Sequence, residues 1–113
     1  MVSATDGKEY VVVFVTTGSA EEAAHLARVL VEDGLAACGN LLGPVRSIYR
    51  WKGKAKDESE TLLMLKTRAS LFEPLKERVL ELHSYDVPEV VALPLVAGHE
   101  DYLDWIDSST RED

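Results

Sequence analysis

The segment EYVVVFVTTGSAEEAAHLARVLVEDG, residues 9–34, decides the fold because it joins a buried strand directly to an amphipathic helix. Its first part, residues 9–17, is a continuous run of mostly β-branched and aromatic residues, which is typical of a strand covered on both faces. Ser19 and Glu22 then match a capping box, and apolar residues recur at helical spacing as far as Gly34, a residue type that commonly ends helices. The segment therefore predicts a central strand followed by a helix.

The rest of the chain predicts a long hairpin, a second helix and another strand. Residues 35–67 have the pattern of a bent strand that is interrupted at Gly43-Pro44 and returns after a polar turn. A second capping box, Ser70 with Glu73, is expected to start an amphipathic helix. The segments EVVALPLV and EDYLDWI then indicate a fourth strand and a short C-terminal helix.

The predicted order is strand, helix, strand, strand, helix, strand, with a helix added at the C-terminus. This is the order of an α+β ferredoxin-like fold, the split βαβ arrangement. The chain has 113 residues, of which 46% are hydrophobic and 28% are charged, a composition typical of one soluble globular domain. We therefore expect a single domain over residues 1–113, with flexible ends at residues 1–8 and 108–113.

The formal net charge of -8 at pH 7 argues against nucleic acid and anionic membrane surfaces as partners, because both repel an acidic protein. Cys38 is the single cysteine, so one chain cannot form an internal disulfide or a multi-thiolate zinc site. The first ten residues also lack the basic start and the apolar stretch of a signal peptide. From these features we expect a cytoplasmic protein.

No arrangement of residues in the sequence predicts catalysis. Three activities found on ferredoxin-like folds have recognisable requirements: basic and aromatic strand residues for RNA binding, paired thiolates for copper delivery, and a glycine-rich loop with an arginine for acyl phosphate hydrolysis. The first strand and the loop after it, YVVVFVTTGSAEE, do not meet them. We expect Cys38 to pack in a strand as a small hydrophobic residue; a soft-metal or redox role is the alternative for this thiol.

Five motifs, DGLAACGN, SIYRWKGK, LKTR, LHSYDVPEVVALP and DYLDWI, occur in this order along the chain. Together they resemble the CutA family of divalent-cation-tolerance proteins, over roughly residues 10–107. The resemblance implies a ferredoxin-like homotrimer, related in architecture to the PII signalling proteins, that responds to metal ions without being an enzyme. Tyr49 and Trp51, which alternate onto one face of their strand, would lie in an arm that contacts a neighbouring subunit.

The resemblance also points to candidate copper ligands. The ligands suggested for the family are a cysteine near the end of the first strand and two adjacent histidines shortly after the second helix. The corresponding residues here are Val15 and the pair Leu82-His83, and Ser84 replaces the proline that follows the histidines. His83 is thus the candidate ligand for copper or another divalent cation, and three copies of it meeting at a trimer axis could form a site.

The same resemblance gathers Trp51, Lys66, Tyr85 and Glu89 near a cleft between subunits, where aromatic, cationic and acidic groups could bind a small ligand. Two functions are consistent with these features. The first is a trimer in the response to metal ions, with weak binding of copper or another divalent cation. The second is a structural or signalling trimer that binds a small ligand or a protein partner at these clefts.

Overall fold

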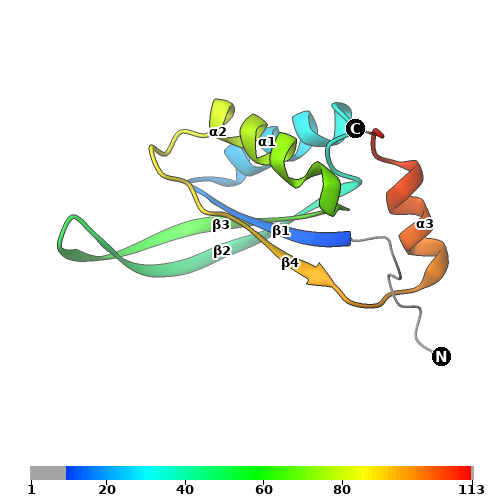
Figure 1. Cartoon of the computed structure of the whole chain (residues 1–113). Coiled ribbons are helices and arrows are strands. Elements are labelled where there is room, and N and C mark those ends of the chain that lie inside the picture. The colour runs from blue at the N-terminus through cyan, green and yellow to red at the C-terminus, as the bar shows by residue number, and fades with distance from the viewer. Residues whose placement is uncertain (1–9, 113) are drawn as a thin grey trace.

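The computed structural model describes residues 10–112, and within this range the elements follow the predicted order (Figure 1). The strands and helices, in chain order, are β1 (Tyr10–Thr17), α1 (Ala20–Glu32), β2 (Cys38–Trp51), β3 (Lys54–Arg68), α2 (Phe72–Leu82), β4 (Val90–Leu95) and α3 (Glu100–Ser108). A short 3₁₀ turn, Ala69–Leu71, joins β3 to α2.

The four strands form one sheet in the order β2-β3-β1-β4, and all neighbouring strands are antiparallel. β1 is a central strand, because Val13 is aligned with Leu65 of β3 on one side and with Ala92 of β4 on the other. The α+β ferredoxin-like arrangement predicted from the sequence is therefore confirmed, including the central position of the first strand.

Helices α1 and α2 cover one face of the sheet, and α3 lies at one end of it (Figure 1). Alternate residues of β1 and β3 point toward the two helices and form the main core, because side chains on a strand alternate between its faces. A smaller cluster attaches α3 to the start of β1. Its buried members are Tyr10, Ala37, Leu103 and Ile106.

The two capping boxes predicted from the sequence have different outcomes. At α1, the Ser19 hydroxyl accepts a hydrogen bond from the Glu22 N–H at 3.1 Å, and the Glu22 carboxylate accepts one from the Gly18 N–H at 3.2 Å. The predicted box at Ser70 and Glu73 is wrong: Ser70 lies inside the 3₁₀ turn, and Leu71 precedes α2 without a side-chain cap. The 3₁₀ turn runs directly into α2, so the helix starts after the position that Ser70 could cap.

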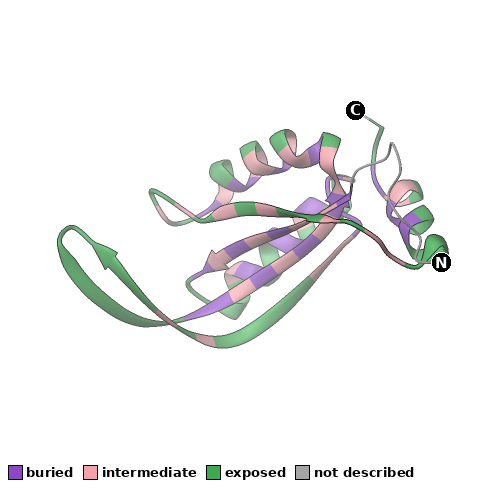
Figure 2. Cartoon of the chain, turned by 60° about the horizontal axis from the view of Figure 1, so that its bottom comes forward, coloured by how far each residue is buried: buried purple, intermediate pink, exposed green. Residues whose placement is uncertain are grey.

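Strands β2 and β3 form a hairpin that extends beyond the rest of the domain (Figure 1) and is largely exposed toward its tip (Figure 2). The interruption predicted at Gly43-Pro44 is a bulge inside one strand: the pairing shifts between Leu42 and Val45 and then resumes. A proline cannot donate to the ladder, so a bulge accommodates it. At the tip, Lys52 and Gly53 both have positive φ values, 51° and 77°, as a tight two-residue turn requires.

The face of the sheet opposite α1 and α2 is open over most of its area (Figure 1). One row of this face consists of Val91, Phe14 and Met64, which are aligned across three neighbouring strands. Several of its apolar side chains are well exposed, including Val91 at 47% and Leu93 at 57%. A protomer therefore presents an apolar sheet surface that its own helices do not cover.

The C-terminal segment 108–113 was predicted to be flexible, but most of it contacts the domain. The Thr110 hydroxyl donates to the Ile106 carbonyl and accepts from the Arg68 side chain, both at 2.9 Å, and the Arg111 N–H donates to the Gly34 carbonyl. Because chain ends are poorly ordered only where nothing holds them, the boundary predicted at residue 108 is too early. The predicted flexible N-terminus, residues 1–8, lies outside the described residues, as does Asp113.

Candidate functional site

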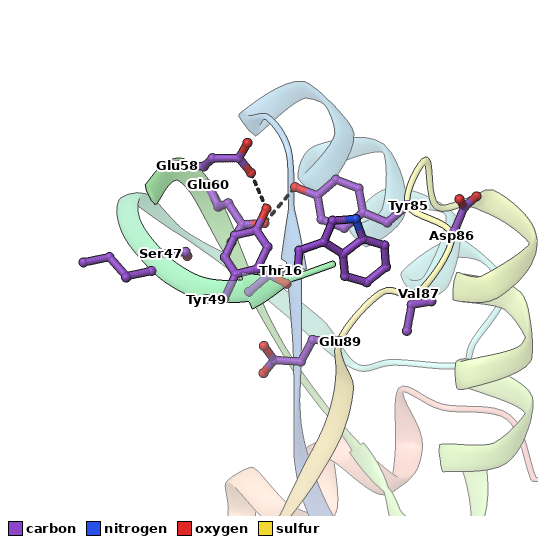
Figure 3. Close-up of a pocket in the computed structure, with 11 residues that line it drawn as sticks. Thr16, Ser47, Tyr49, Glu58, Glu60, Tyr85, Asp86, Val87 and Glu89 are labelled. Atoms are coloured by element: carbon purple, nitrogen blue, oxygen red, sulfur yellow. Dashed lines mark hydrogen bonds between the residues drawn. The ribbon is translucent and has the colours of Figure 1, made fainter. Parts of the chain in front are cut away.

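A cleft of about 600 Å³ lies where the outer part of the β2–β3 hairpin meets the connection between α2 and β4 (Figure 3). Tyr49 and Trp51 of β2 line one side of it, and Tyr85 and Val87 of the connection line the other. The end of β1 contributes Thr16. Three elements that are distant in the sequence therefore meet at one cavity of the size that small ligands occupy.

Two phenols in the cleft donate hydrogen bonds to carboxylates. The Tyr85 hydroxyl donates to Glu60 at 2.7 Å, and the Tyr49 hydroxyl donates to Glu58 (Figure 3). The bond to Glu58 raises the pKa of Tyr49 to about 12. Burial, followed by the bond to Glu60, raises the pKa of Tyr85 above its ordinary value. Both phenols are therefore protonated at neutral pH and serve as hydrogen-bond donors.

The charged residues that line the cleft are acidic. Their carboxylates belong to Glu58, Glu60, Asp86 and Glu89, and no lysine, arginine or histidine is among the described residues of the lining. Glu60 is buried, with 7% of its surface exposed, and the other three are exposed. The cleft thus combines aromatic walls with an excess of negative charge.

His83 lies at the end of α2, outside the lining, and its ring is fully buried. The Tyr85 N–H donates to His83 Nδ1 at 3.0 Å, so this nitrogen must carry a lone pair. The other nitrogen, Nε2, then carries the hydrogen and donates it to the Thr16 carbonyl at 2.8 Å. Because both nitrogens are used within the protomer, the geometry does not support the ligand role predicted for His83.

The contacts of His83 instead position Tyr85. The two rings lie 4.7 Å apart between centroids, and Glu22 accepts from the Ser84 N–H at 2.8 Å. Burial of Glu22 opposes its ionisation, but the hydrogen bonds from Ser84 and Gly18 outweigh this effect and lower the pKa of the carboxyl. An ionised Glu22 therefore joins the start of α1 to the segment that carries Tyr85.

Two other predicted site residues lie away from the cleft. Lys66 is aligned with Cys38 on the open face of the sheet, and its ammonium donates to Asn40 at 2.7 Å. Cys38 is half-buried, with its sulfur 3.7 Å from the Tyr102 hydroxyl. Within residues 10–112, no group of three or more His, Cys, Asp or Glu side chains is placed to hold a metal ion. The described part of the chain thus offers Cys38 no such group for a metal site.

Of the four residues predicted to share a cleft, the structure brings together Trp51, Tyr85 and Glu89 and leaves out Lys66. Glu58 and Glu60 also line the cleft, although no prediction from the sequence included them. Their signal is present, since two acidic residues with one residue between them lie on the same face of a strand.

The chain is similar to known proteins over most of its length. The family model for the CutA1 divalent ion tolerance protein matches residues 11–109. The Arabidopsis thaliana protein named "Protein CutA, chloroplastic" is 48% identical over 101 residues, which cover 89% of this chain and 56% of that protein. A divalent-cation tolerance protein CutA of Thermus thermophilus is also 48% identical, over 88% of this chain and 96% of its own length.

Solved structures are similar along nearly the whole chain. The crystal structure of CutA1 from Oryza sativa has a TM-score of 0.91 and 44% identity, covering 93% of this chain and 96% of its own. A CutA structure from Archaeoglobus fulgidus has a TM-score of 0.86 and 36% identity, covering 88% of this chain and 97% of its own. The residues matched by the family model, 11–109, include the hairpin, the two covering helices and α3.

The cytoplasmic location that was expected from the sequence is wrong. The Arabidopsis relative is named chloroplastic, and the Archaeoglobus structure is described as a periplasmic divalent cation tolerance protein. The names of these relatives therefore contradict the expectation of a cytoplasmic location. In the described part of this chain, no helix is both long enough and apolar enough to span a membrane.

Proposed function

Since the chain belongs to the CutA1 divalent ion tolerance protein family, we propose that it acts in the response to divalent cations as a non-enzymatic homotrimer. In this proposal the cleft beside Trp51 and Tyr85 is a ligand site, and direct binding of copper or another divalent cation is weak. The observation that carries the proposal is the cleft itself, because its aromatic and acidic side chains come from three separate elements and enclose about 600 Å³.

A non-enzymatic role is supported by the hydrogen bonds of the cleft. Tyr49 and Tyr85 each donate to a carboxylate, and both have raised pKa values. A general acid or base works best with a pKa near the working pH, and these phenols are far from that range. Their geometry suits the binding and orientation of a ligand.

A homotrimer is supported by the open face of the sheet and by the hairpin arm. Leu42, Val91 and Leu93 are between 41% and 57% exposed on this face, an arrangement that favours burial against other copies of the chain. Tyr49 and Trp51, predicted as interface residues, are 39% and 40% exposed on the arm. An arm of this length reaches beyond its own domain and can contact a neighbour.

Weak metal binding is supported by the donors available in a protomer. Both His83 nitrogens are engaged, and among the described residues no group of three or more His, Cys, Asp or Glu side chains is placed to hold a metal ion. The remaining donors are carboxylates, which hold Cu(II) less firmly than imidazole or thiolate. Tolerance of divalent cations would then depend on what the trimer binds in the cleft, either a small ligand or a partner protein.

The proposal can be tested by light scattering followed by calorimetric titration of the metal-free protein with Cu(II). We expect the mass of a trimer and no saturable heat at micromolar protein. A monomer would remove the basis for clefts formed with neighbouring subunits. A saturable site of one ion per chain or per trimer would show direct metal binding and would contradict the weak binding proposed.

A further inference from the structure

We propose that the cleft between the hairpin and the α2–β4 connection binds an organic ammonium cation, held by aromatic ring faces and by carboxylates. This inference rests on the proposed function in one respect, since it gives the chemical class of the ligand for the same site. It is argued from the composition and arrangement of the lining.

The aromatic side chains provide surfaces for a cation. Tyr49, Trp51 and Tyr85 all line the cleft, and the two phenols are held by hydrogen bonds to Glu58 and Glu60 (Figure 3). Fixing the hydroxyls in this way fixes the orientation of the rings. Ring faces attract ammonium groups through their quadrupole, and tryptophan does so most strongly.

The charge of the lining selects for a cation. Four carboxylates border the cleft, and none of its described lining residues is basic. An anionic ligand would meet the carboxylates of the lining, whereas a cation would be attracted to them. A neutral ligand would gain no electrostatic attraction from these carboxylates.

The arrangement of the carboxylates favours an organic cation over a metal ion. Divalent ions such as Ca²⁺ need about six to eight oxygen ligands at short distance, and the acidic residues of the cleft do not form such a cluster. Glu58 and Glu60 already accept hydrogen bonds from phenols. A volume of about 600 Å³ and apolar groups such as Val87 suit a ligand with a carbon body.

The chain contains an internal example of the same contact. The Lys52 ammonium lies 6.0 Å from the centre of the Trp51 ring, within the usual range of a cation–π interaction. The hairpin tip around it is basic, with Arg50, Lys52, Lys54 and Lys56 within seven residues. The other candidate occupant of the cleft is therefore the hairpin tip of a second copy, and the experiment must separate the two.

The test uses the full chain in its native assembly and two probes of nearly equal shape. Choline carries a quaternary ammonium, and 3,3-dimethylbutan-1-ol is its uncharged carbon analogue. Calorimetric titration is expected to show saturable choline binding, with the alcohol bound about tenfold more weakly, as the loss of a cation–π and ionic contact predicts. Equal affinities for both probes, or no saturable choline binding, would overturn the proposal.

Two variants locate the site. Trp51→Leu is expected to weaken choline binding by about tenfold, and Glu89→Gln by about threefold, because each removes one kind of contact with a cation. Trp105→Leu is the matched control: Trp105 is 41% exposed, as Trp51 is 40%, but it lies on α3 outside the lining. An equal loss in the Trp105 variant would place the site elsewhere and contradict the proposal.

Light scattering on the same samples distinguishes a failure of ammonium binding from a failure of the proposed trimer. A trimer without choline binding would leave the proposed assembly intact and reject only the ammonium ligand. A trimer that dissociates in Trp51→Leu without any choline binding in the unmodified chain would show that a second copy occupies the cleft. A monomer in the unmodified chain would contradict the assembly on which the proposed function depends.

Discussion

The Tyr85 hydroxyl donates a 2.7 Å hydrogen bond to the buried carboxylate of Glu60, and this bond joins the α2–β4 connection to the base of the hairpin arm. The two residues are 25 positions apart in the sequence and belong to separate elements. Both residues line the cleft, so the strength of the bond bears on both the stability of the domain and the shape of the site.

Replacing Tyr85 by Phe is expected to lower the free energy of unfolding by about 1–3 kcal/mol, because a buried carboxylate would lose its donor. Urea unfolding measures this change. The matched control is Tyr49→Phe, which removes the same type of bond from Glu58, an exposed residue that water can solvate. The loss in the control should be smaller, and equal losses would show that burial of Glu60 does not set the effect.

The four tyrosines of the chain are expected to ionise well above pH 10 in the folded protein. Burial raises the pKa of Tyr10 and of Tyr102 to about 12, assisted by Asp107 and Cys38 respectively. Tyr49 reaches about 12 through its bond to Glu58, and Tyr85 is also raised. Ultraviolet titration of tyrosinate should show little ionisation at pH 10 without denaturant and normal ionisation in urea.

The sign of the corresponding stability change follows from the direction of these shifts. A phenol with a higher pKa in the folded state stabilises the fold below the unfolded value, near 10, and this contribution is lost as the pH rises from about 10 to about 12. Urea midpoints should therefore fall across that interval. Ionisation of all four phenols near pH 10 in the folded protein would contradict this prediction.

Replacing His83 by Ala is expected to leave Cu(II) binding unchanged and to lower stability by about 1–3 kcal/mol, because the Thr16 carbonyl and the Tyr85 N–H would lose their partner. Calorimetry and urea unfolding measure the two effects. His25→Ala serves as the control, since His25 lies on the exposed side of α1. A saturable Cu(II) site in the unmodified chain that is lost in the His83 variant alone would restore its role as a ligand.

Replacing Leu93 by Asp is expected to dissociate the proposed trimer while the protomer stays folded. Leu93 is 57% exposed on the open sheet face. An aspartate at this position would be solvated in a separate protomer, but its charge would be buried in an interface. Light scattering reports the mass, and circular dichroism reports the fold. Leu80→Asp is the control, because Leu80 is 47% exposed on α2, in the opposite layer. An unchanged mass in the Leu93 variant would exclude this face as the interface.

The fold could be predicted from local signals because each element carries its own pattern. The uninterrupted apolar run of β1 and the Ser19 cap of α1 led directly to the observed strand and helix. The start of α2 could not be predicted in the same way. The packing of Leu71 into the core accompanies a 3₁₀ turn there, and a tertiary contact of this kind leaves no local pattern in the sequence.

The site was predictable in part for a similar reason. Trp51, Tyr85 and Glu89 were found through motifs, but the exclusion of Lys66 depends on where along β3 the cleft lies. The role of His83 depends on the Thr16 carbonyl, which is 67 positions away in the sequence. Contacts between distant backbone atoms decide whether a histidine is available to a metal, and residue types alone do not encode them.

The bulge between Leu42 and Val45 changes which residues of β2 lie on the open face of the sheet. Before it, even-numbered residues such as Asn40 are aligned with the open-face residues of β3; after it, odd-numbered residues such as Tyr49 and Trp51 take that alignment. If all the present residues followed a regular ladder without a bulge, Tyr49 would pair with Ala55 instead of Lys56, and both aromatics would lie on the helix side of the sheet. The aromatic wall therefore depends on the number of residues at the bulge as well as on residue type: deleting one residue there would let a regular ladder keep Tyr49 opposite Lys56, whereas inserting one residue into a strand without the bulge would not.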